Sequence, residues 1–181
     1  MSTSIYNVPI WAGDPGTQYF VNDIVYVLSG TSKLYYYALI DHTSAGTDIS
    51  TDRDAGKWAG FQLDSNGINI PYFVWQANYS SSVNVNPKVA STKMGDGYEQ
   101  RMRDGINNVL LVLDLVFENR SLTETTAITH FLYTRAAVDA FIFYPPPPFN
   151  VQKKFVCPSF QDRYVFFDNY TIQATFNEVV N

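Results

Sequence analysis

Few residues of this chain have the types and spacing needed for chemistry. A cysteine nucleophile needs a thiol and a base, and Cys157 and His130 are the candidates. Cys157 follows an alternating apolar pattern typical of a strand, where a buried, inert thiol is the commoner outcome. Paired carboxylates for glycoside hydrolysis are defined by a distance in space, so the sequence leaves them open. Because no catalytic motif is present, we expect a protein that is not an enzyme.

The composition argues against several other classes of function. One cysteine cannot form an internal disulfide, and two histidines form no cluster with zinc spacing, so no metal site or cofactor is predicted. Residues 1–68 hold three basic and seven acidic groups, and residues 69–181 hold nine and ten. Neither part has the cationic surplus of a nucleic-acid-binding protein. No stretch approaches the roughly 20 apolar residues of a membrane span, and no signal segment is evident.

The elements that must position these residues are predicted to be mainly strands. The chain of 181 residues is 46% apolar and only 16% charged, which indicates a globular protein. Its 13 Tyr and 13 Phe favour β structure. One helix is expected, because Ser121 and Glu124 form a capping box before a run that continues to about Ala137. The apolar face of this helix is predicted to contain Leu122, Ile128, Phe131 and Leu132.

The predicted strands fall into two groups along the chain. The first group is 19–27 and 34–40, with Gly30 in the short gap expected of a hairpin or meander. The second is 109–117, 141–144, 154–158, 163–167 and 170–180. The run 109–117 is apolar except for Asp114 and is expected to be covered on both faces, so Asp114 needs a partner or an exit to solvent.

Polar segments divide the chain. The turn signal Asp64 to Gly67 predicts a boundary between a small β module at 1–66 and a larger domain at 67–181. The segment 43–54 is expected to be a loop inside the first module. The segment 78–86 is rich in Ser and Asn and is expected to form a surface loop or arm. Four prolines at 145–148 are expected to end a strand.

The most specific motif is Gly95-Asp96-Gly97-Tyr98-Glu99-Gln100-Arg101, followed by Asp104-Gly105-Ile106-Asn107. Taken alone, Gly-Asp-Gly predicts a tight turn. Arg101 and Arg103, two residues apart, would share one face of a strand. With Tyr98 they are candidates for a subunit contact or for a row that faces a lumen, against the alternative of a solvated face.

With further motifs in the same order, this segment resembles the minor tail protein M family of long-tailed bacteriophages over residues 69–181. The supporting motifs are Phe73-x-Trp75, Pro87-x-Val89, Phe131-Leu132, Phe141-x-Phe143-x-Pro145-Pro146, Lys153 to Cys157 and Thr175 to Asn181. The resemblance implies a fold similar to the tail tube, a β-barrel or sandwich. It also implies a virion structural protein made in the host cytoplasm.

The resemblance further implies a place in the virion and a set of partners. The protein is expected at the distal tip of a long non-contractile tail, as a homohexameric ring between the tail tube and the baseplate hub. Its partners would be other copies of itself, the tail tube protein, the hub or next tail-tip protein, and the tape measure protein. Sheet edges and the polar segment 78–86 are the expected means of joining neighbours, because an unpaired edge pairs readily with another chain.

The first 66 residues require a separate explanation. They contain Trp11, Tyr19, Asn22-Asp23-Ile24-Val25, Leu34-Tyr35-Tyr36 and Trp58, a pattern that resembles the small carbohydrate-binding modules of chitinases. In place of the usual Gly, Asn22 also accepts left-handed backbone angles.

The resemblance implies that Trp11, Tyr36 and Trp58 stack on sugar rings, as aromatic faces do. The alternative is that these aromatic residues form the core of a small module that needs all of its large side chains. In the tail, the module is expected to project outward as a repeated decoration.

Two other functions remain as alternatives. The protein could be an adhesin that binds a host surface glycan through residues 1–68. It could instead be a tail-associated hydrolase of peptidoglycan or surface polysaccharide. Neither explains why the more specific resemblance lies in residues 69–181.

Overall fold

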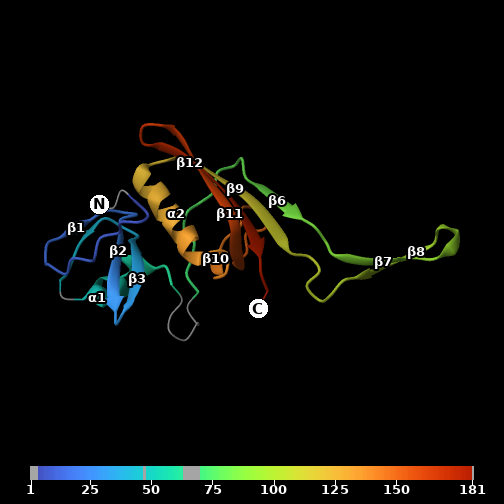
Figure 1. The fold of residues 1–181 in the computed structure, drawn as a ribbon, viewed down its shortest axis with the longest axis horizontal. Helices are drawn as coiled ribbons and strands as arrows, with labels where there is room; N and C mark the ends of the chain where they lie inside the picture. The colour runs from blue at the N-terminus through green and yellow to red at the C-terminus, as the bar shows by residue number, and fades with distance from the viewer. Residues whose placement is uncertain (1–3, 47, 63–69, 181) are drawn as a thin grey trace.

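The computed structural model describes residues 4–46, 48–62 and 70–180. Three parts follow one another along its longest axis (Figure 1). The module comprises the described residues up to 62, the body is a β-sheet with a long helix, and the arm is a two-stranded hairpin at the opposite end from the module. The predicted mainly β fold with one principal helix is confirmed.

The module contains two small sheets and a short helix. Strands β2 (Ile24–Ser29), β3 (Ser32–Ala38) and β5 (Trp58–Gly60) form one antiparallel sheet, and β1 (Gln18–Tyr19) pairs with β4 (His42–Thr43). The predicted hairpin at Gly30 is confirmed, with φ 62° at this glycine. The predicted left-handed backbone of Asn22 is also confirmed, with φ 69°.

The prediction of a loop over residues 43–54 is wrong for the second half of this segment, where the chain forms helix α1 (Ile49–Asp54). The Asp48 side chain caps this helix by accepting a hydrogen bond from the Ser50 amide at 3.0 Å. Asp52, on the helix, is buried and paired with Lys57 at 2.7 Å. The Ser and Asp content that predicted a loop therefore supplies a helix cap and a buried ion pair.

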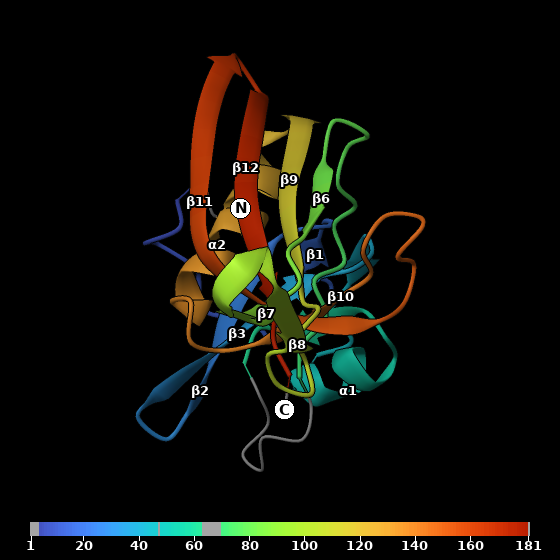
Figure 2. The ribbon, with the colours of Figure 1, turned by 90° about the vertical axis from the view of Figure 1, so that its right-hand side faces the viewer.

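The body is a five-stranded antiparallel sheet in the order β10-β11-β12-β9-β6. These strands are β6 (Ser82–Val85), β9 (Leu111–Arg120), β10 (Phe141–Phe143), β11 (Lys153–Phe166) and β12 (Asn169–Glu178). Figure 2 shows β11, β12, β9 and β6 side by side in front of α2 (Leu122–Arg135). Only one face of the sheet is covered by this helix.

Three details of the body differ from expectation. The strands expected at 154–158 and 163–167 are one strand, β11, because a bulge between Val156 and Ser159 accommodates Pro158. Part of the segment 78–86, which was expected to be a surface loop or projection, is instead strand β6 and pairs with β9. The run 109–117 is covered on one face only: Leu113 and its odd-numbered neighbours are buried, whereas the even-numbered residues face outward.

Helix α2 begins as predicted and is buried on more sides than predicted. Ser121 accepts a hydrogen bond from the Glu124 amide at 3.3 Å. The Glu124 carboxylate instead pairs with Arg120 at 2.7 Å, so one half of the capping box forms. Ile128, Phe131 and Leu132 are buried as expected, but Leu122 is only half-buried and every residue from 125 to 132 is buried.

The reason is that α2 lies between two layers, the sheet on one side and the module on the other (Figure 1). Phe131 contacts Phe73 and Phe141 of the body and Phe61 of the module, at ring-centroid distances of 5.4–5.6 Å. His130 packs against Phe61 and against Tyr35 of β3.

Module and body share one hydrophobic core. Ile24, Tyr37 and Phe61 of the module belong to the same buried cluster as the apolar residues of α2 and the sheet. Two hydrogen bonds add to this contact: the Tyr37 hydroxyl donates to the Tyr72 carbonyl at 3.1 Å, and the Trp75 indole donates to Asn22 at 2.9 Å. The predicted boundary at Asp64 to Gly67 lies outside the described residues.

The arm consists of β7 (Val89–Lys93) and β8 (Glu99–Arg103), joined by the turn η1 (Gly95–Gly97). The predicted tight turn is confirmed: Asp96 and Gly97 have φ of 65° and 81°. The arm projects from the body on the side opposite to α2 and the module (Figures 1 and 2). Among the described residues, it pairs with no strand other than its own two.

Candidate assembly surfaces

The arm carries Arg101, Arg103 and Tyr98, the residues expected to contact a subunit or face a lumen. All three are exposed, with Tyr98 at 63% and the Arg101 side chain at 72%. Alternation along the strand places both arginines on one face of the hairpin, as predicted. Whether this face meets a neighbouring subunit or a lumen stays a prediction.

One face of the arm is cationic. Cross-strand pairing puts Arg103 opposite Val89, Arg101 opposite Ser91, and Glu99 opposite Lys93. Only Arg101 and Glu99 form an ion pair within this face, at 3.1 Å. With three cations against one carboxylate, this cationic face has a net charge of +2 in a chain whose total is -5.

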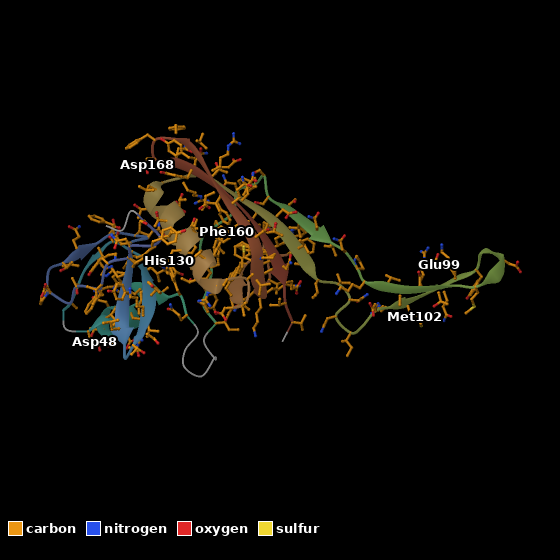
Figure 3. All side chains as sticks on the ribbon, viewed as in Figure 1. Asp48, Glu99, Met102, His130, Phe160 and Asp168 are labelled. Carbon is orange, nitrogen blue, oxygen red and sulfur yellow. The ribbon has the colours of Figure 1, made fainter. Side chains whose placement is uncertain are left out.

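The other face of the arm is uncharged and carries methionine beside the polar pair Gln100 and Thr92. Met102 lies opposite Ala90, and Met94 joins the end of the hairpin through its amide, which donates to the Tyr98 carbonyl at 2.8 Å. Met102 and Met94 are 55% and 51% exposed. Figure 3 shows Met102 and Glu99 on the arm, far from the side chains of the body. Unbranched Met side chains adapt readily to a partner surface.

A two-stranded hairpin of this kind is marginally stable in water without further packing. Every residue of the arm strands is exposed except the half-buried Glu99. The arm therefore has two chemically distinct faces and, within the part of the chain that the structure describes, almost no contact beyond its own two strands. The sequence pattern indicated the two arginines, whereas the exposure of Met94 and Met102 became apparent only in the structure.

The second candidate surface is the face of the body sheet that α2 leaves uncovered. It is polar, and its charged residues balance, with two cations and two carboxylates among the outward residues of the paired strands. Its members are Ser82, Asn84, Val112, Asp114, Val116, Glu118, Ile142, Lys154, Val156, Ser159, Gln161, Arg163, Thr171, Gln173, Thr175 and Asn177.

Asp114 lies near the centre of this uncovered face and has the partners that its charge requires. It accepts hydrogen bonds from Asn84 at 2.8 Å and from Thr175 at 3.0 Å. A shallow groove of about 500 Å³ runs beside it, between residues of β6, β9, β12 and β11. The groove is lined largely by hydroxyl and amide groups, so it is suited to wet, polar contacts.

Two strand edges of the body are open. Strand β6 is last in the sheet order, and β10 pairs only with Lys153–Phe155, which leaves the remainder of β11 with no strand on its outer side among the described residues. Open edges offer unpaired backbone groups to another chain. The hairpin between β11 and β12 also exposes Phe166 at 60% and Phe167 at 87%.

The aromatic residues of the module are placed very differently from one another. Trp58 is 3% exposed and meets Tyr19 and His42 edge-on, so it has no free ring face for a sugar in this structure. Trp11 and Tyr36 are half-buried against the same cluster. Tyr36 lies opposite Gly60, which has no side chain to cover its ring. Sugar binding by Trp11 and Tyr36 stays a prediction.

The two residues considered for nucleophilic catalysis are poorly suited to it. Burial raises the pKa of the Cys157 thiol to about 12, and its sulfur donates to the Ser159 carbonyl. Burial lowers the pKa of His130 to about 4, and its ring faces the module side of α2 against Tyr35 and Phe61. Near neutral pH the sulfur of Cys157 is therefore a protonated thiol and not a nucleophilic thiolate.

Within the described residues, no three His, Cys, Asp or Glu side chains are grouped as a metal would require. None of the helices in the described ranges is long and apolar enough to cross a membrane.

Comparison with known proteins assigns the residues of the body and arm to a protein family. A family model described as phage minor tail protein matches residues 71–180, more than half of the chain. A search of curated sequences returns no match. A solved structure titled as the tail of an empty GTA particle, computed with helical refinement and C6 symmetry, is similar at a TM-score of 0.41 and 13% identity. The match covers 66% of this chain and 89% of the other. Because its family model spans most of the chain, this protein belongs to the phage minor tail protein family.

Proposed function

We propose that the protein forms a ring at the distal tip of a long non-contractile phage tail, between the tail tube and the baseplate hub. Membership of the phage minor tail protein family supports a structural role in the virion tail. The position at the tip and a hexameric ring are the finer parts of the proposal.

One observation carries the proposal: the uncovered sheet face and the exposed arm both lie away from the module. The uncovered sheet face and the arm are on the same side of the body, opposite to α2 (Figures 1 and 2). A neighbouring copy that approaches from this side would cover the polar sheet face and give the arm a surface to pack on. The open edges of β6 and β11 are available for additional strand pairing.

This arrangement favours a contact between two different surfaces of identical copies. Such head-to-tail contacts close into rings when the rotation between copies permits it. In the proposed ring, Arg101, Arg103 and Tyr98 contact the next subunit. The tail tube protein and the hub or next tail-tip protein would bind above and below, and the tape measure protein would reach the central channel.

We retain the two-part organisation, with a module at 1–66 and a tail domain at 67–181, as part of the proposal. The module would add a repeated outer surface to the ring. Its packing against α2 through Tyr35, Tyr37 and Phe61 means that it is held firmly against the body and is not tethered by a linker alone.

A second candidate function is contact with a host surface glycan through the module. The observation that favours it is the half-exposed ring of Tyr36 beside Gly60, with Trp11 packed against the same cluster. Six modules on one ring would strengthen a weak sugar contact through multivalency. Retention of the protein on polysaccharide, lost in the Tyr36→Ala variant, is the expected result if this function is real.

The ring is tested first by multi-angle light scattering of the purified protein, followed by electron microscopy of the assembled species. We expect rings with a central hole, and the number of subunits in each ring can be counted directly.

The position in the tail needs a second experiment. Phage lacking the gene should regain infectious tails when the protein is supplied, with antibody label at the tail tip. Label along the whole tail, or full infectivity without the protein, would contradict the proposed place.

A further inference from the structure

The cationic face of the arm has two cations that its own chain does not neutralise. Arg101 pairs with Glu99, whereas Lys93 and Arg103 form no ion pair with any residue that the structure describes. Lys93 lies opposite Glu99, which is four residues from Arg103 along β8. The two unpaired cations are therefore about 14 Å apart along one face of the hairpin.

The uncovered sheet face has two carboxylates at the same spacing. Asp114 and Glu118 both face outward on β9 and are four residues apart. Within the described ranges, neither of them forms an ion pair. The outward residues opposite Asp114, which are Ser82 on β6 and Thr175 on β12, are uncharged. Charge and spacing therefore make this stretch of β9 complementary to the cationic face of the arm.

The surroundings of Asp114 suit a guanidinium group. Asn84 donates to one oxygen of the carboxylate and Thr175 to the other, and an ionised carboxylate has about four acceptor positions. The groove beside Asp114 also contains the amides of Gln161 and Gln173. Their oxygens can accept the remaining N–H groups of an arginine. An arginine can therefore bind here without displacing the hydrogen bonds that Asp114 already accepts.

We infer that the arm of one copy lies along β9 of a neighbouring copy, with its cationic face on the uncovered sheet face. The two unpaired cations then meet the two carboxylates of β9, because both pairs have the same spacing. Complementary charges of this kind guide association and fix its register. Only one face of the hairpin is used, so the opposite face, which carries Met102, turns away from the contact.

The arm extends away from the body of its own copy, so a second copy must provide this contact (Figures 1 and 2). The inference rests on the proposed ring and names the surface that the arm contacts within it.

The first test neutralises the two surfaces separately. The arm-neutral variant is Lys93→Gln/Arg103→Gln, and the face-neutral variant is Asp114→Asn/Glu118→Gln. Each should weaken self-association of the full chain about tenfold, because each removes both ion pairs of the contact. Light scattering in low salt measures this as a shift in the concentration midpoint. Added salt should weaken association of the native protein more than that of either variant.

The two sets of substitutions should also couple. Combined in one chain, they should weaken association little more than either set alone, as a double-mutant cycle records. The control variant Lys33→Gln/Arg53→Gln removes two cations from exposed positions of the module and should leave the midpoint unchanged. Additive losses, or a loss in the control equal to that of the arm-neutral variant, would overturn the contact.

The second test distinguishes the two faces of the arm. Ser91 lies opposite Arg101 on the cationic face, and its exposed neighbour Thr92 lies on the other face. Ser91→Cys and Thr92→Cys are each mixed with size-tagged Gln173→Cys and a short bismaleimide; the native Cys157 is only 3% exposed and is a poor target. Ser91→Cys should give at least about threefold more mixed dimer, because adjacent side chains point to opposite faces of a strand. Equal yields, or predominant Ser91→Cys homodimers, would overturn the contact.

The same contact is tested in the assembled tail. The Ser91→Cys/Gln173→Cys chain is supplied to phage lacking the gene, and the tails are cross-linked and separated under denaturing conditions. We expect a ladder of cross-linked subunits, which the matched Thr92→Cys/Gln173→Cys chain should not give. Absence of cross-linked product both in solution up to about 0.5 mM and in the tails would overturn the contact.

These outcomes separate the inference from the proposed function. Rings that form without this cross-link overturn the contact between the arm and β9 but leave the ring standing. Failure of the protein to localise at the tail tip, whatever the cross-linking result, contradicts the proposed function.

Discussion

The core around α2 buries its large side chains against one another, whereas the arm leaves its large side chains exposed. Phe131 alone meets the rings of Phe61, Phe73, Trp75 and Phe141, all within 6 Å between centroids. The arm, in contrast, leaves Tyr98 and Met102 more than half exposed. The chain thus concentrates its packing in the core and leaves the arm with little packing among the described residues. Four measurements of the free energy of unfolding would test this contrast.

The largest effect is expected in the core. Phe131→Ala removes a ring that joins the module, helix and sheet, and it should lower the free energy of unfolding by about 3–5 kcal/mol. Tyr98→Ala, at the tip of the arm, should change it by less than about 0.5 kcal/mol. Urea denaturation followed by tryptophan fluorescence measures both. Similar losses for the two variants would contradict the contrast.

The second effect depends on pH and tests the interface between α2 and the module. The pKa of His130 falls from 6.5 to about 4 on folding because the ring is buried. Between these values the unfolded chain binds the proton and the folded chain does not, so stability falls as pH decreases from 6.5 to 4. The contribution is on the order of 3 kcal/mol.

The matched variant for this effect is His130→Phe, which keeps an aromatic ring beside Tyr35 and Phe61 and cannot titrate. Subtracting its stability profile from that of the native protein isolates the histidine from the carboxylates. The difference should be flat above pH 6.5 and should decline below it. Parallel profiles throughout would show that His130 is accessible to protons in the folded state.

A smaller effect is expected at the hydrogen bond between Asn22 and Trp75. Asn22→Gly tolerates the left-handed backbone but leaves the Trp75 indole without its acceptor, at a cost of about 1–2 kcal/mol. Asn22→Ala loses the same bond and adds about 1 kcal/mol of backbone strain. Thermal and urea unfolding should rank native, Gly and Ala in that order. Equal stabilities for Gly and Ala would indicate that the turn relaxes.

The smallest effect is expected when the arm is removed. The Asp104 amide donates to the Lys88 carbonyl at 3.1 Å, so a two-residue turn can join these positions in place of residues 89–103. Folding stability should stay the same or rise by about 0.6 kcal/mol, because the loop to be closed becomes shorter. Self-association should be lost. A large fall in stability would show that the arm supports the fold of its own chain.

Much of the local structure could be predicted from residue types. The left-handed angle at Asn22, the Ser121 cap and the Gly95–Gly97 turn follow from backbone preferences that act within a few residues. The strand β11 was harder to predict, because Pro158 indicates a break unless a bulge and an open outer edge remove the need for its amide hydrogen.

The assembly of these elements was less predictable. The pattern of α2 indicates one apolar face, but Thr129 and His130 are buried as well, because Thr129 donates to Asp162 of the sheet and His130 packs against Tyr35 and Phe61 of the module. Small hydroxyl residues carry little signal for burial. Trp58 was predicted as a possible sugar-binding residue because an aromatic ring suits both a sugar site and a small core, and the structure places it in the core of the module.

The shared core has a consequence for how such a tail gene can be inherited. A recombination event that exchanged the first 66 residues for an unrelated segment would remove Tyr37 and Phe61 and expose the rings of His130 and Phe131 to water. A functional exchange would have to bring a replacement that covers the same side of α2. The module and body are therefore expected to pass between phages as one unit.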